Sequence, residues 1–247
     1  NYLSIITIPF MVIWPIFWLL FPVFSQMYAK WELEKIKLVK HIFQKNFLDV
    51  WFAFNILFFV FAREIAYVLF WEKFIESWII LYYSILFLIF NFLMQVNFNI
   101  MAAMWRVKER LNIILIALVF NTVLNIVFIK MIWVYGSALA TGFWWLLIYI
   151  LSEIKLKEFK TSFDVKYISK NLTFLVLIWV FMFYAINPLF AWIPRFVAFW
   201  FLFLISLIYF WIFLIFNYSE FKFFILEIKS LTRYSLLLNT ISIIFKT

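Results

Sequence analysis

The sequence lacks cysteine altogether and has two glycines, one histidine and only 13% charged residues. Without cysteine the chain has no disulfides, no thiolate metal ligands and no thiol nucleophile. The single histidine, His41, has no partners at metal-ligand spacing, and the sequence contains no glycine-rich phosphate loop. No apolar run holds a cluster of His, Asp or Glu at depth. We therefore expect a protein that is not an enzyme and that holds neither metal nor cofactor.

Apolar residues, in contrast, dominate the chain. They make up 68% of it and include 37 Phe and 14 Trp, whereas an ordinary soluble domain is roughly 45–50% apolar. A soluble fold of this length would bury about two thirds to three quarters of its surface, which leaves too little interior for these side chains. The runs are nearly continuous over about twenty residues rather than alternating as in outer-membrane strands. These features predict an all-α integral membrane protein.

Seven apolar runs are each close to the length that crosses a hydrocarbon core. They fall at about residues 3–24, 47–69, 77–104, 111–131, 134–152, 170–188 and 194–216. We predict a transmembrane helical domain over residues 1–216 and a cytoplasmic or interfacial tail over 217–247, whose last apolar run is too short to span. Because the chain opens at Asn1 with no basic segment before its first run, we expect a fragment that begins within a longer protein.

Basic residues gather at every second junction between these runs, namely at 30–45, 106–110 and 155–170, and in the tail. The exceptions among the 21 Lys and Arg are Arg63, Lys73, Lys130 and Arg195. Cytoplasmic loops of membrane proteins are enriched in Lys and Arg, so this alternation predicts an outside N-terminus and a cytoplasmic C-terminus. The same rule accounts for the net charge of +9 without nucleic acid as a partner. Charged and apolar residues mixed at helical spacing in 30–45 and 153–166 predict amphipathic helices on the membrane surface.

The scarcity of glycine is unusual, because average usage of about 7% would give roughly 17 residues where this chain has two. Several tryptophans stand where a turn or a helix end typically has glycine: Trp31, Trp71, Trp105 and Trp133. One hypothesis is that the source organism reads UGA as glycine and that the sequence was translated with UGA as tryptophan. The alternative is an AT-rich genome in which tryptophan is enriched as an interfacial anchor.

Amide side chains recur every fourth residue in two of the runs: Asn91, Gln95 and Asn99 in the third, Asn121 and Asn125 in the fourth. Polar residues are costly in lipid and usually face a cavity or another helix. One interpretation is a stripe that lines a central cavity and binds a saccharide. The other is hydrogen bonding between helices, worth about 0.6 kcal/mol per contact.

Arg63 lies near the outer end of the second run, next to Glu64. A guanidinium suits bidentate contact with phosphate, so Arg63 is a candidate for binding the pyrophosphate of a lipid carrier. The alternative is an interfacial pair whose side chains extend to the outer headgroups.

Four segments carry a family resemblance when these tryptophans are taken as possible glycines. They are Leu-Phe-Pro-Val-Phe-Ser at 20–25, the helix end at 65–74, the turn Met-Trp-Arg-Val-Lys-Glu-Arg at 104–110, and residues 121–141 with Trp-Val-Tyr-Gly-Ser-Ala at 133–138. Their order, spacing and sidedness resemble the polysaccharide biosynthesis proteins, oligosaccharide flippases of the multidrug/oligosaccharidyl-lipid/polysaccharide exporter superfamily. Members have two pseudo-symmetric lobes, so the resemblance implies that this chain is the C-terminal lobe and lacks the N-terminal one.

The resemblance implies translocation of an undecaprenyl-pyrophosphate-linked oligosaccharide across the inner (plasma) membrane during cell-envelope polysaccharide biosynthesis. The implied partners are the bilayer, that lipid-linked saccharide and the N-terminal lobe. A lipid II flippase and a multidrug antiporter of the same superfamily stay open as alternatives, although an antiporter should carry acidic residues deep in a helix. A membrane-embedded ligase or glycosyltransferase, which should have large outer loops, and a non-catalytic assembly subunit are the rivals from other classes.

Overall fold

The computed structural model describes residues 2–48, 51 and 77–161, together with eight isolated positions between 169 and 204. All of these belong to the first of two compact units, residues 1–206. Every regular element in these described ranges is a helix, in agreement with the predicted all-α class. The runs 47–69, 170–188 and 194–216 and the tail 217–247 lie wholly or largely outside them.

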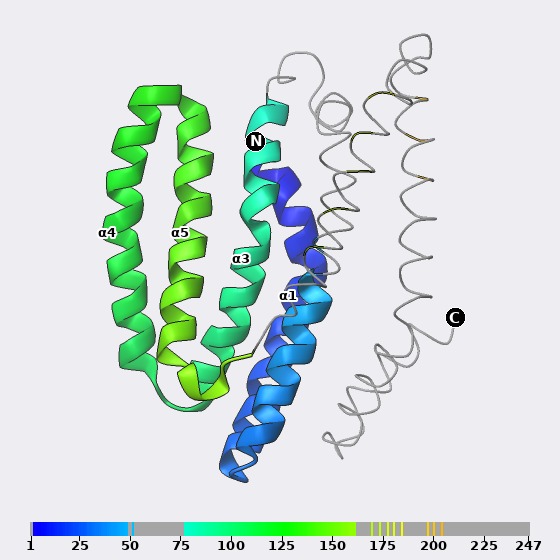
Figure 1. Cartoon of the computed structure of the whole chain (residues 1–247), viewed down its shortest axis with the longest axis vertical. Helices are drawn as coiled ribbons and strands as arrows, with labels where there is room; N and C mark the ends of the chain where they lie inside the picture. The colour runs from blue at the N-terminus through cyan, green and yellow to red at the C-terminus, as the bar shows by residue number, and fades with distance from the viewer. Residues whose placement is uncertain are drawn as a thin grey trace. The chain divides into compact units, whose positions relative to one another are not determined.

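Helix α1 (Tyr2–Ala29) and the helical residues 33–48 form an antiparallel hairpin (Figure 1). The rings of Phe17 and Phe47, which lie on either side of the turn at Trp31, have centroids 5.0 Å apart. The predicted amphipathic pattern is present in the second arm, where Ile36, Val39 and Phe43 are buried. These three residues of the apolar stripe are covered by protein, whereas Leu33 at its start is exposed.

Three further helices run up and down next to this hairpin: α3 (Ser77–Ala103), α4 (Val107–Ile132) and α5 (Val134–Lys155), which is followed by the short 3-10 helix η2 (Lys157–Phe159). Their 27, 26 and 22 residues correspond to about 40, 39 and 33 Å at about 1.5 Å per residue. A hydrocarbon core is about 30 Å thick. Within the described residues, the stretches long and apolar enough to cross a membrane are Tyr83–Ala103, Val107–Ile132 and Tyr135–Lys155.

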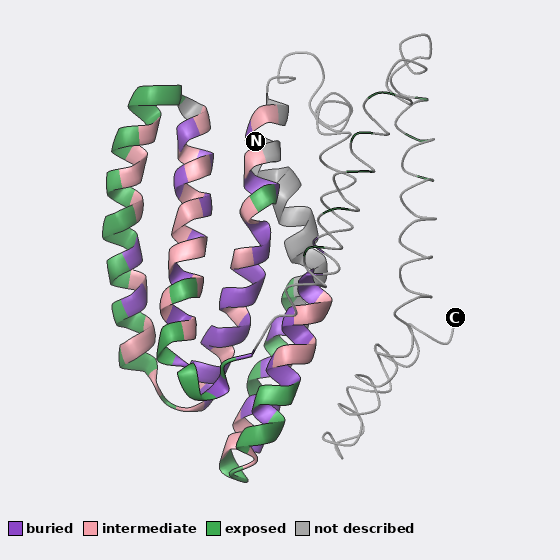
Figure 2. Ribbon diagram, in the orientation of Figure 1, coloured by how far each residue is buried: buried purple, intermediate pink, exposed green. Residues whose placement is uncertain are grey.

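Helix α3 is the most buried of these helices and α4 the most exposed (Figure 2). The ring of Phe92 on α3 packs against Phe17 and Phe47, with centroids 6.1 and 5.7 Å away, so α3 closes an aromatic core with the hairpin. On α4 the buried residues are Ile113 and Ala117. Its exposed side chains are mainly apolar, among them Leu111, Leu115, Ile116, Val119, Val123 and Ile126. A helix with so much exposed apolar surface needs lipid as its solvent.

Helix α5 lies between α3 and α4 (Figure 1) and packs closely against both. Its first half is buried at small residues, Ala138 and Ala140, whereas the larger Trp145 and Ile148 are buried further along. A Cβ atom at Gly142 would overlap the ring of Phe87 on α3. Small residues of this kind let membrane helices approach closely.

Candidate functional site

A buried polar network lies where α3 and α5 end beside the hairpin. It is built from Lys40 and Gln44 of the hairpin, Asn97 of α3, Ser152 and Glu153 of α5, and Thr161 after η2. All of these residues except Glu153 are buried. The network joins three helical segments that are far apart in the sequence.

Glu153 is the centre of the network. The Nζ atom of Lys40 lies 2.9 Å from each of its carboxylate oxygens. Gln44 and Asn97 donate their side-chain amides to Oε1 at 3.0 and 2.9 Å. The Lys40 side chain is 0% exposed and that of Glu153 18% exposed. Because a buried ammonium is unfavourable without a paired and hydrogen-bonded partner, this ion pair holds the hairpin against α5.

The amides of Gln44 and Asn97 extend the network to two hydroxyl groups, those of Thr161 and Ser152. The hydroxyl of Thr161 donates to Oε1 of Gln44 at 2.7 Å. Both the nitrogen and the oxygen of the Gln44 amide therefore form hydrogen bonds. Asn97 also donates to Oγ of Ser152 at 2.8 Å. Its own side-chain oxygen is buried and has no hydrogen-bond partner within the described part of the chain. Satisfied buried networks specify one arrangement of helices, and this one leaves a single acceptor open at Asn97.

The charges of the network are one cation and one anion, Lys40 and Glu153. Burial lowers the pKa of Lys40 below its ordinary value, and the charges of Glu153 and Glu158 partly offset that effect. The described ranges contain no group of three His, Cys, Asp or Glu side chains that could hold a metal ion. The arrangement joins three helical segments and carries a charge pair whose protonation depends on pH.

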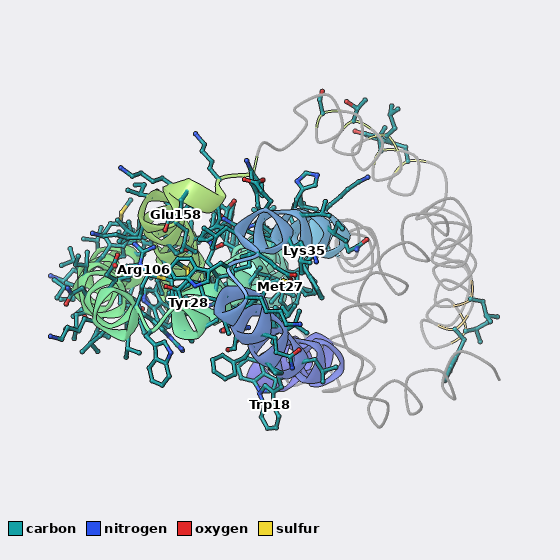
Figure 3. The ribbon with its side chains drawn as sticks, turned by 90° about the horizontal axis from the view of Figure 1, so that it is seen from below. Trp18, Met27, Tyr28, Lys35, Arg106 and Glu158 are labelled. Atoms are coloured by element: carbon teal, nitrogen blue, oxygen red, sulfur yellow. The ribbon has the colours of Figure 1, made fainter. Side chains whose placement is uncertain are left out.

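A second ionic cluster ties the α3–α4 turn to the end of α5. Arg106 makes a bidentate contact with Glu109, with Nε to Oε1 at 2.7 Å and Nη2 to Oε2 at 2.9 Å. It also donates to Glu158 at 2.5 Å and to the carbonyl of Lys155 at 2.8 Å (Figure 3). The hydrogen bond with Glu109 and the charge of Glu158 raise the pKa of Arg106 further. The basic junctions around 106–110 and 155–160 therefore lie at one end of the described helices.

The amides predicted on α3 lie in three different settings. Asn91 is buried, and its side-chain oxygen has no hydrogen-bond partner in the described ranges. Gln95 is half-buried. Asn99 donates to the backbone carbonyl of Phe17 at 3.3 Å, which is a contact between helices.

The amides predicted on α4 bond to each other. Asn125 donates to the backbone carbonyl and the side-chain oxygen of Asn121 at 2.9 and 2.8 Å, within one helix. Helix α5 lies between α3 and α4, the two helices that carry these amide stripes. Arg63 lies outside the described residues, and the substrate-binding role of all six residues stays a prediction.

Sequence reasoning missed Asn97, Lys40 and Glu153. Asn97 is two positions away from Gln95 and from Asn99, which on a helix of 3.6 residues per turn places it on a different face from that stripe. Lys40 and Glu153 are ordinary members of two charged junctions, and no spacing in the sequence marks them as partners.

Comparison of the chain with protein-family models, with curated proteins and with solved structures gives no match. The family resemblance of the sequence therefore stays a prediction.

Proposed function

We propose that the chain is the C-terminal lobe of a flippase that moves a lipid-linked oligosaccharide across the inner (plasma) membrane, with about seven spans and its N-terminus outside. The observation that carries this proposal is the pair of ionic contacts Lys40–Glu153 and Arg106–Glu158. These contacts bring basic residues of the junctions at 30–45, 106–110 and 155–160 to one end of the described helices. A membrane protein inserted by the positive-inside rule needs such a shared basic end, and the resembling segments follow the same order.

The acidic side chains of the described spans favour a saccharide over a cationic drug. Glu109 lies in the first turn of α4 and is bound by Arg106, and Glu153 lies near the end of α5 and is bound by Lys40. Cation-coupled antiporters are expected to use an available carboxylate at depth. Most polar side chains deeper in α3 and α4 are amides, beside the hydroxyls of Ser84 and Thr122, and amides offer donors and acceptors to sugar hydroxyls.

In the proposed mechanism this lobe and the N-terminal lobe rock around a site near the bilayer midplane. Asn91 and Gln95 of α3 would contact the saccharide, and Arg63 would contact the pyrophosphate of the carrier. The lipid tail of the carrier stays in the bilayer throughout.

The test is complementation of a flippase-null strain with the full-length gene, carrying glycine at the suspect tryptophan codons. We expect surface polysaccharide to be restored. A second strain carrying Asn91→Ala and Gln95→Ala should lose polysaccharide at an unchanged membrane abundance, while the matched pair Asn121→Ala and Asn125→Ala should lose less. Failure of the unmodified gene to restore polysaccharide, with normal abundance in the membrane, would contradict the proposed function.

A further inference from the structure

Three turns of the structure contain a residue with left-handed backbone geometry, and in each case that residue is tryptophan. The φ angles are +57° at Trp31, +59° at Trp105 and +57° at Trp133. Neither Gly136 nor Gly142 has positive φ, and no other non-glycine residue in the described ranges does. In this region the Cβ atom of an L-residue crowds the following carbonyl oxygen, which is why glycine is the usual occupant.

The hydrogen bonds of the first two turns follow the pattern of a helix end closed by glycine. After α1, the N–H groups of Trp31 and Glu32 donate to the carbonyls of Tyr28 and Met27, both at 3.0 Å. These bonds span three and five residues, and together they define a Schellman motif in which the left-handed residue is most often glycine.

The turn after α3 repeats this pattern. The N–H groups of Trp105 and Arg106 donate to the carbonyls of Ala102 and Met101 at 3.1 and 2.9 Å. These two hydrogen bonds again span three and five residues, and the left-handed residue has the same place between them. Trp105 is therefore the counterpart of Trp31.

Trp133 makes the strongest case, because it alone connects α4 to α5. Its φ of +57° is combined with a ψ of −142°, close to a backbone region that glycine occupies almost exclusively. Its N–H donates to the carbonyl of Ile129 at 2.9 Å, and its own carbonyl accepts from Gly136 at 2.9 Å. Both backbone groups of Trp133 therefore form hydrogen bonds within the connection. A Cβ atom at this position adds steric strain and no hydrogen bond.

The indoles at these positions contribute little to the fold. Trp31, Trp105 and Trp133 are 76%, 86% and 78% exposed, and the ring of Trp31 contacts Tyr28 in the last turn of α1. Trp51 gives the opposite case within the same chain. It is 8% exposed, and its indole N–H donates to the carbonyl of Ile85 at 3.0 Å. The side chain of Trp51 packs and forms a hydrogen bond in the interior, whereas at the other three positions only the backbone conformation forms part of the fold.

We propose that the protein made in its source organism carries glycine at positions 31, 105 and 133, encoded by UGA codons that were read as tryptophan in this sequence, and a genuine tryptophan at 51. UGA is a stop codon in the standard code, and variant codes assign it to either tryptophan or glycine. An interfacial anchor would need only a helix end and would have no reason to coincide with every left-handed residue described. The proposal is independent of the proposed function.

The gene and the native protein test this proposal directly. We expect UGA at codons 31, 105 and 133 and UGG at codon 51. Peptide mass spectrometry of protein from the source cells should give peptides across the three turns that are lighter by the difference between an indole side chain and hydrogen. UGG codons at the three positions, or peptides with the mass of tryptophan there, would overturn it.

A recombinant comparison tests the structural reason separately. The full chain with Trp31→Gly, Trp105→Gly and Trp133→Gly should unfold in detergent at a Tm higher by about 5 °C or more than the chain with three tryptophans. The matched control is Trp18→Gly, because Trp18 is exposed and points outward from α1 (Figure 3) but lies inside a helix. Glycine there should lower Tm. An unchanged or lower Tm in the triple variant would contradict the proposal.

Discussion

The ammonium group of Lys40 lies 2.9 Å from both carboxylate oxygens of Glu153, a residue 113 positions further along the chain. Because the Lys40 side chain is fully buried, this contact is a structural joint between the hairpin and α5. Its charges lie among amide and hydroxyl groups from Gln44, Asn97 and Thr161.

Removing one charge of this pair should cost more than removing both. Lys40→Met leaves the Glu153 carboxylate without its counter-charge, and we expect a loss of about 3 kcal/mol, at the low end for buried pairs because Glu153 is partly exposed. Adding Glu153→Gln, which keeps an acceptor for Gln44 and Asn97, should recover most of that loss. Thermal unfolding in detergent measures both variants.

The matched control for Lys40 is Lys35, whose ion pair with Glu32 is solvent-exposed on the same hairpin. Lys35→Met should change stability by less than about 0.5 kcal/mol. Equal losses for Lys35→Met and Lys40→Met would show that the buried pair does not hold the two segments together.

The lowered pKa of Lys40 predicts a dependence of stability on alkaline pH. Because the folded state loses this proton at a lower pH than the unfolded state does, the unfolded state binds more protons in the window just below the ordinary value of 10.5. Stability contributed by this group should therefore rise with pH across that window. The measurement is the slope of Tm against pH for the native chain minus that for Lys40→Met. A difference slope of zero or of opposite sign would contradict the direction of the shift.

The absence of cysteine allows a direct test of which ends lie together. Lys108→Cys in the first turn of α4 and Lys157→Cys in η2 should react alike with a membrane-impermeant maleimide in intact cells. Lys130→Cys should show the opposite labelling, because Lys130 and Lys108 lie at opposite ends of α4 and hence on opposite sides of the membrane. Permeabilised cells serve as the control for reactivity. Different sidedness for positions 108 and 157 would contradict the topology.

Close packing between α3 and α5 depends on Gly142. Since an added Cβ atom would overlap the ring of Phe87, Gly142→Ala should cost about 1–3 kcal/mol through displaced packing. Combining it with Phe87→Ala should make the alanine at 142 nearly neutral relative to Phe87→Ala alone. The double-mutant cycle in detergent unfolding measures this coupling, and additive losses would show that the ring does not limit the approach.

Helices α3, α4 and α5 were predictable from the apolar runs 77–104, 111–131 and 134–152, but their ends were not. The predicted runs 111–131 and 134–152 correspond to α4 (Val107–Ile132) and α5 (Val134–Lys155). The difference comes from charged terminal turns, which hydropathy excludes. Glu109 belongs to α4 because Arg106 binds it, and Glu153 belongs to α5 because Lys40 does.

Turns or helix ends were predicted at Trp31, Trp105 and Trp133, and each of these residues has positive φ in the structure. Such positions can be identified from their neighbours because turn geometry is local. Trp71 lies outside the described residues. The polar network was not predictable, since contacts between residues more than a hundred positions apart arise from tertiary packing rather than from spacing.

Helices α4 and α5 are fastened to each other at both ends, by the single residue Trp133 at one and by the Arg106 cluster at the other. Two helices joined at both ends must tilt in the membrane as a unit. At about 39 Å, α4 exceeds a hydrocarbon core of about 30 Å, so a thinner bilayer would incline the pair as one body. A change in membrane thickness would thereby shift α5 against α3 at the contact between Gly142 and Phe87, with no change inside any helix.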